Sequence, residues 1–179
     1  MSSRCERSKR VVYSLISDLE AEYGEFEVLE KTWHQPPARC QRLVDQFEDA
    51  ALGGAGVWLT NDAGDVLLVQ NVGDEGWSDP GGSVEVGEPY EDAAIREVRE
   101  ETGIECELTG LREVHVVEHR NTETDEPVAF EAIAIFHGEY VEGEPRPREG
   151  EIADVDWFSR PPETVLYEEV RTRPYPGRD

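Results

Sequence analysis

The chain has 179 residues, which is enough for one domain with a full core and a modest extension. Its 41 acidic residues oppose 17 basic ones, so the formal net charge at pH 7 is -24. This charge argues against a nucleic-acid partner, because such a surface needs clustered Lys and Arg. The sequence has no apolar run of the roughly 18 residues that a membrane span requires, so it predicts no membrane partner.

The acidic residues are spread over the whole chain, and only Lys9 and Lys31 are lysines. This composition is typical of proteins from cells with molar internal salt. Salt shortens the electrostatic screening length to roughly 3 Å at 1 M, so a self-repelling surface becomes tolerable. We therefore predict a halophilic protein, with an ordinary acidic protein as the alternative.

The three cysteines, Cys5, Cys40 and Cys106, are odd in number and form no C-x-x-C pair. This usage predicts buried thiols in a reducing, cytoplasmic location. The apolar patch VVYSLI near the N-terminus is too short for the core of a secretory signal.

Residues 1–50 are predicted to form a helical N-terminal extension. Apolar residues at helical spacing indicate a helix over 11–23, a short strand is expected over 26–33, and a second helix over 36–50. Amphipathic helices must bury their apolar stripes. We expect them to pack on their own domain, with a cover over the substrate pocket or a homodimer contact as the alternatives.

Residues 51–179 are predicted to form the main domain. Turn residues at 61–64 predict a hairpin over 55–71, and a helix is expected between Pro89 and Gly103. Strands are predicted over 106–111, 112–122, 128–140 and 152–158, followed by a closing helix over 161–172. The fold class is therefore α/β (α+β), a mixed sheet with few helices.

The helix between Pro89 and Gly103 carries an acidic face. Glu97, Glu100 and Glu101 fall within an arc of about 100° at 3.6 residues per turn. Carboxylates at this spacing repel one another, and a bound dication would offset this repulsion and form a metal site. Oxygen ligands favour Mg²⁺ or Mn²⁺ over zinc. The alternative is the solvated acidic face of a salt-adapted protein.

Residues around this helix fit the spacing G-x5-E-x7-R-E-U-x-E-E-x-G-U, where U is aliphatic, at every fixed position. The matching residues are Gly82, Glu88, Arg96, Glu97, Val98, Glu100, Glu101, Gly103 and Ile104. This pattern resembles the signature of the Nudix hydrolases, and the likeness extends from about residue 54 to 170. One departure is Asp79, which precedes Pro80 where the family usually has an apolar residue.

The resemblance implies a mixed sheet sandwiched between helices and hydrolysis of a nucleoside diphosphate linked to another moiety, with Mg²⁺ or Mn²⁺. Glu97, Glu100 and Glu101 would then be metal ligands together with the Gly81 carbonyl, and Glu97 is also a candidate base. Arg96 would orient the glutamates through charge-assisted hydrogen bonds.

The resemblance also implies roles around these ligands. Gly82 would let the loop approach the phosphates, while Glu88 and Gly103 would shape the motif. A further acid outside the motif is expected, with Glu151 as first choice and Glu149 as second. Trp77 would either stack on a base or pack within its loop.

We predict a small-molecule nucleotide substrate. ADP-ribose-like molecules or nucleotide sugars are favoured over nucleoside triphosphates, because the N-terminal extension offers room for a larger leaving group. The alternative is a catalytically silent nucleotide-sensing or interaction module on the same fold. His115 and His119 share one face of a strand but lie roughly 13 Å apart, too far for one zinc ion.

Overall fold

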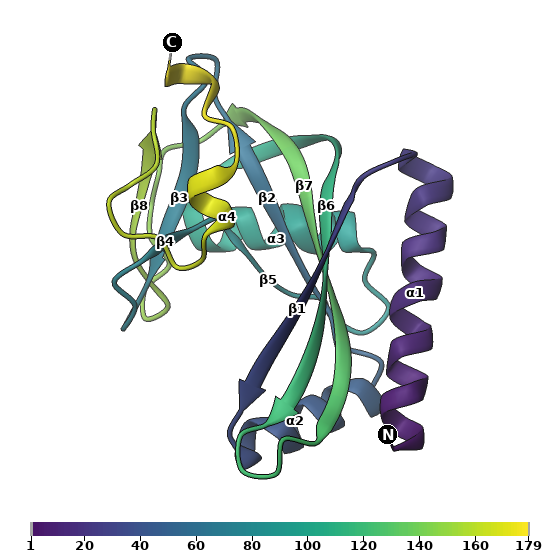
Figure 1. The fold of residues 1–179 in the computed structure, drawn as a ribbon. Coiled ribbons are helices and arrows are strands. Elements are labelled where there is room, and N and C mark those ends of the chain that lie inside the picture. Colours follow the sequence, from purple (N-terminus) through teal and green to yellow (C-terminus); the bar gives the residue numbers. More distant parts are fainter. Residues whose placement is uncertain (1, 179) are drawn as a thin grey trace. The chain divides into compact units, whose positions relative to one another are not determined.

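The computed structural model describes residues 2–178 (Figure 1). The helices are α1 (Ser3–Tyr23), α2 (Pro37–Glu48), α3 (Tyr90–Thr102) and α4 (Glu169–Thr172), with a short 3₁₀ turn at Pro176–Arg178. The strands are β1 (Glu27–Gln35), β2 (Gly54–Thr60), β3 (Val66–Asn71), β4 (Trp77–Ser78), β5 (Gly81–Ser83), β6 (Glu105–Asn121), β7 (Pro127–Glu142) and β8 (Ile152–Phe158). None of these helices is both long and apolar enough to cross a bilayer.

The chain packs as two compact units, each built from three segments. Unit 1 contains residues 1–55, 83–90 and 111–135, and unit 2 contains residues 56–82, 91–110 and 136–179. Strands β6 and β7 contribute residues to both units. The division predicted between residues 50 and 51 stays a prediction.

In unit 1, α1 begins earlier than predicted because Ser2 caps it. The Ser2 hydroxyl accepts a hydrogen bond from the Cys5 N–H at 3.2 Å, which satisfies one of the free donors at the helix start. Val12, Ile16 and Leu19 are buried along one face of the helix. The buried Ser8 hydroxyl accepts from the Phe130 N–H of β7 at 2.9 Å. Helix α1 therefore packs on β7 within unit 1, and a pocket cover or a homodimer contact by this extension stays a prediction.

Strand β1 pairs in parallel with β6, in a register that runs from Glu27 beside Glu113 to Gln35 beside Asn121. The residues 106–111 and 112–122, predicted as two strands, form the single strand β6. A turn connects β6 to β7, and the Asn121 side chain accepts from the Glu123 N–H at 2.8 Å. Hydrogen bonding connects the strands in the order β1-β6-β7-β2-β3-β4, with β5 beside β2 and β8 beside β3.

Unit 2 contains the predicted hairpin, now β2 and β3. The Asn61 side chain accepts from the backbone of Ala63 and Asp65, and Gly64 adopts a φ of 80° that favours glycine. Strand β8 pairs antiparallel with β3. With parallel and antiparallel pairs in one sheet and helices around it, the structure confirms the predicted mixed α/β fold class.

The prediction of a closing helix over 161–172 is wrong for most of its length, since only α4 at Glu169–Thr172 is helical. The preceding residues pair with the backbone of β4 instead. The Trp77 N–H donates to the Thr164 carbonyl at 3.1 Å, and the Leu166 N–H donates to the Trp77 carbonyl at 2.9 Å. Extended pairing of this kind is incompatible with the helix that the local pattern favours.

All three cysteines are free thiols. Burial raises the pKa of the Cys106 thiol to about 11, and it also raises the pKa of Cys5 and of Cys40. Because the thiolate is the reactive form, iodoacetamide should alkylate Cys106 more than tenfold slower at pH 8 than a free cysteine with a pKa of about 8.5. The rate should rise with pH until about pH 11. Peptide mapping by mass spectrometry checks this, and free-cysteine rates at pH 8 would contradict it.

Candidate active site

Helix α3 holds its three predicted carboxylates in three different environments. Ala93, Ala94 and Val98 are fully buried and fix the helix on the core of unit 2. Glu101 is only 8% exposed, Glu97 is partly buried, and Glu100 is exposed. The acidic face is therefore not the uniformly solvated surface that composition alone would favour.

The backbone of Gly81 and Gly82 lies against two of these carboxylates. The Gly81 N–H donates to Glu101 Oε2 at 3.0 Å. At Gly82 an added Cβ would lie 2.5 Å from the carboxyl carbon of Glu97, so a larger residue there would displace this carboxylate. The structure thus brings together four predicted residues, two glycines and two glutamates. The role of the Gly81 carbonyl as a ligand stays a prediction.

The clustering of acids shows in their pKa values. Burial raises the pKa of Glu101 to about 8, the Gly81 N–H opposes this shift, and the charge of Glu97 adds to it. Burial also raises the pKa of Glu97, while the Arg96 guanidinium opposes it. Ionisation of these two carboxyl groups in the folded protein therefore costs free energy, and a bound cation would relieve that cost.

Two arginines pair with acids of this cluster. Arg96 Nη1 lies 2.8 Å from Glu97 Oε1 and 3.3 Å from Glu100 Oε2, and its orienting role stays a prediction. Arg148 Nη1 lies 3.1 Å from Glu100 Oε2 and 3.4 Å from Glu151 Oε2. Arg148 was not predicted, because no local spacing links it to α3. It places the predicted Glu151 beside the cluster.

The other predicted residues have local roles in the structure. Glu88 accepts from the Glu85 N–H at 2.9 Å and so braces its own loop. Gly103 ends α3 with a φ of 73°. Trp77 packs edge-on against Phe158 with ring centroids 4.7 Å apart. Its stacking on a base, and any role of the exposed Glu149, stay predictions.

The donor set of the cluster fits a hard divalent cation, since the three carboxylates and the glycine backbone offer only oxygen. Across residues 2–178, no three His, Cys, Asp or Glu side chains converge as a formed cation site. Arginines hold Glu100 instead. The buried histidines belong elsewhere, since His115 and His119 each lie 2.7 Å from a different glutamate, Glu113 and Glu131.

Asp79, the departure from the family pattern, forms a buried ion pair. Its Oδ1 lies 2.7 Å from Arg173 Nη1, and the two side chains are 3% and 2% exposed. The Tyr167 hydroxyl also donates to Asp79, and the Arg173 guanidinium lies 5.1 Å from the Trp58 ring centroid. This network anchors the segment that leads into Gly81 and Gly82 to the C-terminal residues of unit 2.

The carboxylate cluster of α3 and the mixed sheet can now be compared with known protein families. The family described as the NUDIX domain matches residues 52–173. The chain belongs to the Nudix hydrolase family.

Two groups of curated relatives share part of this domain. The NAD-capped RNA hydrolase NudC of Pseudomonas aeruginosa is 40% identical over 78 residues, which are 44% of this chain and 25% of NudC. The RNA pyrophosphohydrolase of Pseudomonas fluorescens is 44% identical over 52 residues, 29% of this chain and 33% of that protein. The matches thus span a quarter to a third of the length of these relatives.

Solved structures extend the likeness in fold. A UDP-X diphosphatase aligns over 92% of this chain and 74% of its own, with 20% identity and a TM-score of 0.52. A MutT NUDIX hydrolase from Burkholderia pseudomallei aligns over 65% of this chain and 90% of its own, with 29% identity and a TM-score of 0.52. The first of these likenesses concerns the fold alone.

Proposed function

We propose that this chain is a divalent-metal-dependent pyrophosphohydrolase that cleaves the diphosphate bond of a nucleoside diphosphate derivative. The observation that carries the proposal is the contact of Glu97 and Glu101 with the backbone of Gly82 and Gly81. This contact unites the acidic helix with the loop that the family motif places beside the phosphates.

The residues of the cluster have distinct roles in this reaction. When bound, Mg²⁺ or Mn²⁺ neutralises phosphate charge and makes a water more acidic. Glu97, Glu100 and Glu101 would hold the cation with the Gly81 carbonyl. Glu97 would take the proton of the attacking water, because burial raises its pKa towards the operating range of a base.

Around this centre, other residues orient the carboxylates and admit the substrate. Arg96 fixes the direction of the Glu97 and Glu100 carboxylates. Gly82 leaves space for the Glu97 carboxylate, which therefore lies against the loop that would approach the diphosphate. Glu151, held near the cluster by Arg148, is a further acid for ligation or proton transfer.

ADP-ribose-like molecules and nucleotide sugars are the favoured substrates, ahead of nucleoside triphosphates. The family match begins at residue 52, so the chain carries additional residues before it. These residues can contact a second moiety attached to the diphosphate. The related proteins are named an NAD-capped RNA hydrolase and an RNA pyrophosphohydrolase. A net charge of -24 argues against a long RNA here.

A substrate panel with Mg²⁺ and with Mn²⁺ tests the proposal. It should contain ADP-ribose, nucleotide sugars, nucleoside triphosphates, NAD and NAD-capped RNA, with chromatography of the products. We expect a nucleoside monophosphate from the first two groups at the highest kcat/KM. Binding of these molecules without cleavage of any would favour the alternative, a silent nucleotide-sensing module in the cytoplasm.

Divalent cations should stabilise the protein against heat. A ligand at about 100 times its Kd adds about 2.7 kcal/mol to the stability of the folded state, which corresponds to several degrees in Tm for a chain of this size. We expect this gain from millimolar Mg²⁺ or Mn²⁺ and a smaller gain for Glu100→Gln. Melting curves at fixed ionic strength measure it. A melting temperature that does not change with divalent ions would support a solvated acidic face instead.

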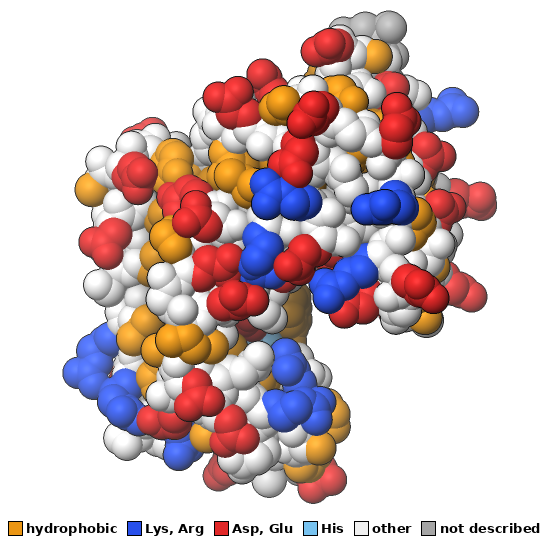
Figure 2. Space-filling view, turned by 180° about the vertical axis from the view of Figure 1, so that it is seen from behind, with side chains coloured by type: hydrophobic (Ala, Val, Ile, Leu, Met, Phe, Trp, Pro, Cys, Tyr) orange, Lys and Arg blue, Asp and Glu red, His pale blue; other side chains and the backbone are white. Residues whose placement is uncertain are grey.

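The surface charge should make stability depend on monovalent salt. Figure 2 shows acidic side chains, in red, scattered over the visible face with a few basic groups among them. Below a few tenths molar KCl the screening length grows towards about 10 Å, and repulsion among 41 acidic residues should destabilise the fold. Urea unfolding across a KCl series checks this. Full stability in salt-free buffer would contradict the halophilic interpretation.

A further inference from the structure

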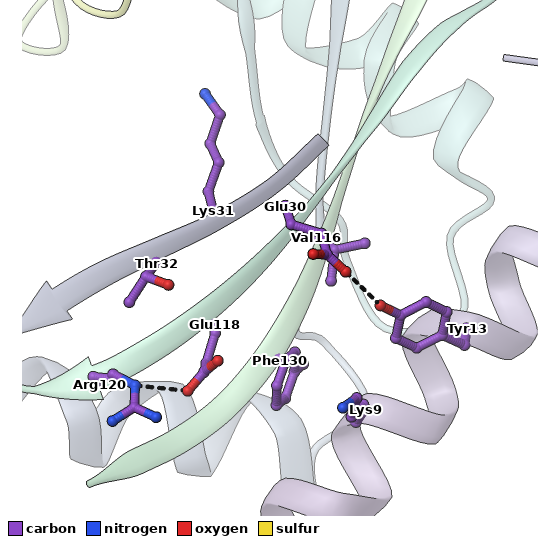
Figure 3. Close-up of a pocket in the computed structure, with 9 residues that line it drawn as sticks. All are labelled: Lys9, Tyr13, Glu30, Lys31, Thr32, Val116, Glu118, Arg120 and Phe130. Carbon is purple, nitrogen blue, oxygen red and sulfur yellow. Dashed lines mark hydrogen bonds and ion pairs between the residues drawn. The ribbon is translucent and has the colours of Figure 1, made fainter. Parts of the chain in front are cut away.

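A pocket of about 310 Å³ lies in unit 1 between α1 and the sheet (Figure 3). Its floor follows from the parallel register of β1 and β6, which places Glu30 beside Val116 and Thr32 beside Glu118. Lys9 and Tyr13, four residues apart on α1, form the opposite wall. The volume is at the lower end of the roughly 300–1,000 Å³ range of small-molecule sites. None of its lining residues belongs to the family motif.

Cationic side chains line this pocket although acidic residues of the chain outnumber basic ones by 41 to 17. Lys9 and Arg120 lie among the carboxylates of Glu30 and Glu118, while the Lys31 side chain is directed away from the others (Figure 3). Lys9 Nζ lies 5.3 Å from the Phe130 ring centroid. Within residues 2–178, Lys9 forms no ion pair. A bound anion would give the Lys9 ammonium an ion-pair partner.

Arg120 is held in place by neighbours that leave part of its guanidinium available. Its Nε donates to Glu118 at 2.7 Å, and its Nη1 donates to the Asp125 carbonyl at 2.6 Å. Its Nη2 takes part in neither bond. The Asp125 carboxylate also lies near it, with Oδ2 3.6 Å from Nη1, so the charge of the guanidinium is largely balanced. The fixed guanidinium therefore offers the pocket a hydrogen-bond donor.

The pocket also contains acceptors for hydroxyl groups. The Glu30 carboxylate accepts from the Tyr13 hydroxyl at 3.1 Å, and the Glu118 carboxylate faces the same space (Figure 3). Carboxylates repel a bare anion but accept hydrogen bonds from a polyol. Cations with nearby carboxylates therefore suit a molecule that carries phosphate at one end and hydroxyls at the other.

We propose that this pocket binds a phosphorylated sugar, with the phosphate at Lys9 and the sugar hydroxyls at Glu30, Glu118 and the Arg120 guanidinium. A free sugar phosphate and the sugar-phosphate part of a nucleotide share this chemistry. The site is additional to the α3 carboxylates and does not depend on the reaction proposed for them.

Isothermal titration of the full chain tests this proposal, in EDTA and at fixed ionic strength. The probes are ribose 5-phosphate, AMP, ribose and inorganic phosphate. We expect saturable binding of ribose 5-phosphate, and Lys9→Gln and Arg120→Gln should each raise its Kd at least tenfold. Lys9→Met, which keeps the apolar stem on Phe130, should do the same. Circular dichroism and melting curves establish that each variant is folded.

Two matched controls separate the pocket from general charge and from the α3 site. Arg10→Gln removes an exposed charge next to Lys9 but outside the pocket, and Glu97→Gln alters only the α3 cluster. Both should bind ribose 5-phosphate as the unaltered chain does. AMP binding tenfold tighter than ribose 5-phosphate would identify a nucleotide as the source, and equal affinity would identify a free sugar phosphate.

The proposal would be overturned by the absence of saturable binding to either phosphate ester, by equal loss of binding in Arg10→Gln, or by loss of binding in Glu97→Gln. Inorganic phosphate bound as tightly as ribose 5-phosphate would also overturn it, because the hydroxyl contacts would then contribute nothing.

Discussion

Glu97→Gln and Glu101→Gln are each expected to lower turnover by at least about 10²-fold while the protein stays folded. Each change keeps the size of the side chain and removes a negative charge from the cluster. The two carboxylates lie against the Gly81–Gly82 backbone, so they face the position that the diphosphate would take. Their loss should lower kcat far more than it raises KM.

The measurement is steady-state hydrolysis of the preferred substrate by purified variants at saturating Mg²⁺. Asp92→Asn is the matched control, because Asp92 is an exposed acid on the same helix outside the cluster. It should retain near-normal turnover. Near-normal turnover of both Glu97→Gln and Glu101→Gln would show that the reaction, if any, occurs elsewhere.

The second large effect concerns stability. Asp79→Asn or Arg173→Met should each lower the free energy of unfolding by about 3–5 kcal/mol, because each leaves an uncompensated polar or charged group in the core. The pair is almost fully buried, with side chains 3% and 2% exposed. Replacing both partners in Asp79→Leu/Arg173→Met should recover much of the loss, since apolar packing often substitutes for a buried ion pair.

Urea unfolding at fixed KCl concentration measures these changes. The exposed pair Arg99–Glu105 is the matched control, with side chains 56% and 36% exposed. Glu105→Gln should cost no more than about 1 kcal/mol, since exposed pairs contribute little. A cost as small as that for Asp79→Asn would show that the buried pair does not anchor this segment.

Local sequence signals predicted the elements that local chemistry determines. The Asn61 and Gly64 turn fixed the β2–β3 hairpin, and Pro89 and Gly103 bounded α3. The acidic arc of α3 was also readable, because helical periodicity alone places its members together. The same periodicity did not show that Glu101 is buried, since that depends on the loop packed over it.

Features set by distant partners were not predictable in this way. The parallel pairing of β1 with β6 joins residues more than 80 positions apart, and Arg173 reaches Asp79 across 94 positions. Arg148 approaches Glu100 across 48 positions. The segment before α4 has a helical pattern, but its pairing with Trp77 prevails. In each case a tertiary contact overrides or adds to the local preference.

The most direct test of the account is whether the intact chain cleaves a diphosphate bond with a divalent cation. Phosphorus NMR can follow ADP-ribose and a nucleotide sugar with Mg²⁺, with Mn²⁺ and with EDTA. We predict that two phosphomonoester signals replace the diphosphate signals in either cation and that EDTA prevents this. Diphosphate signals that persist for every substrate, in a folded protein that binds the nucleotide, would contradict the proposed hydrolysis.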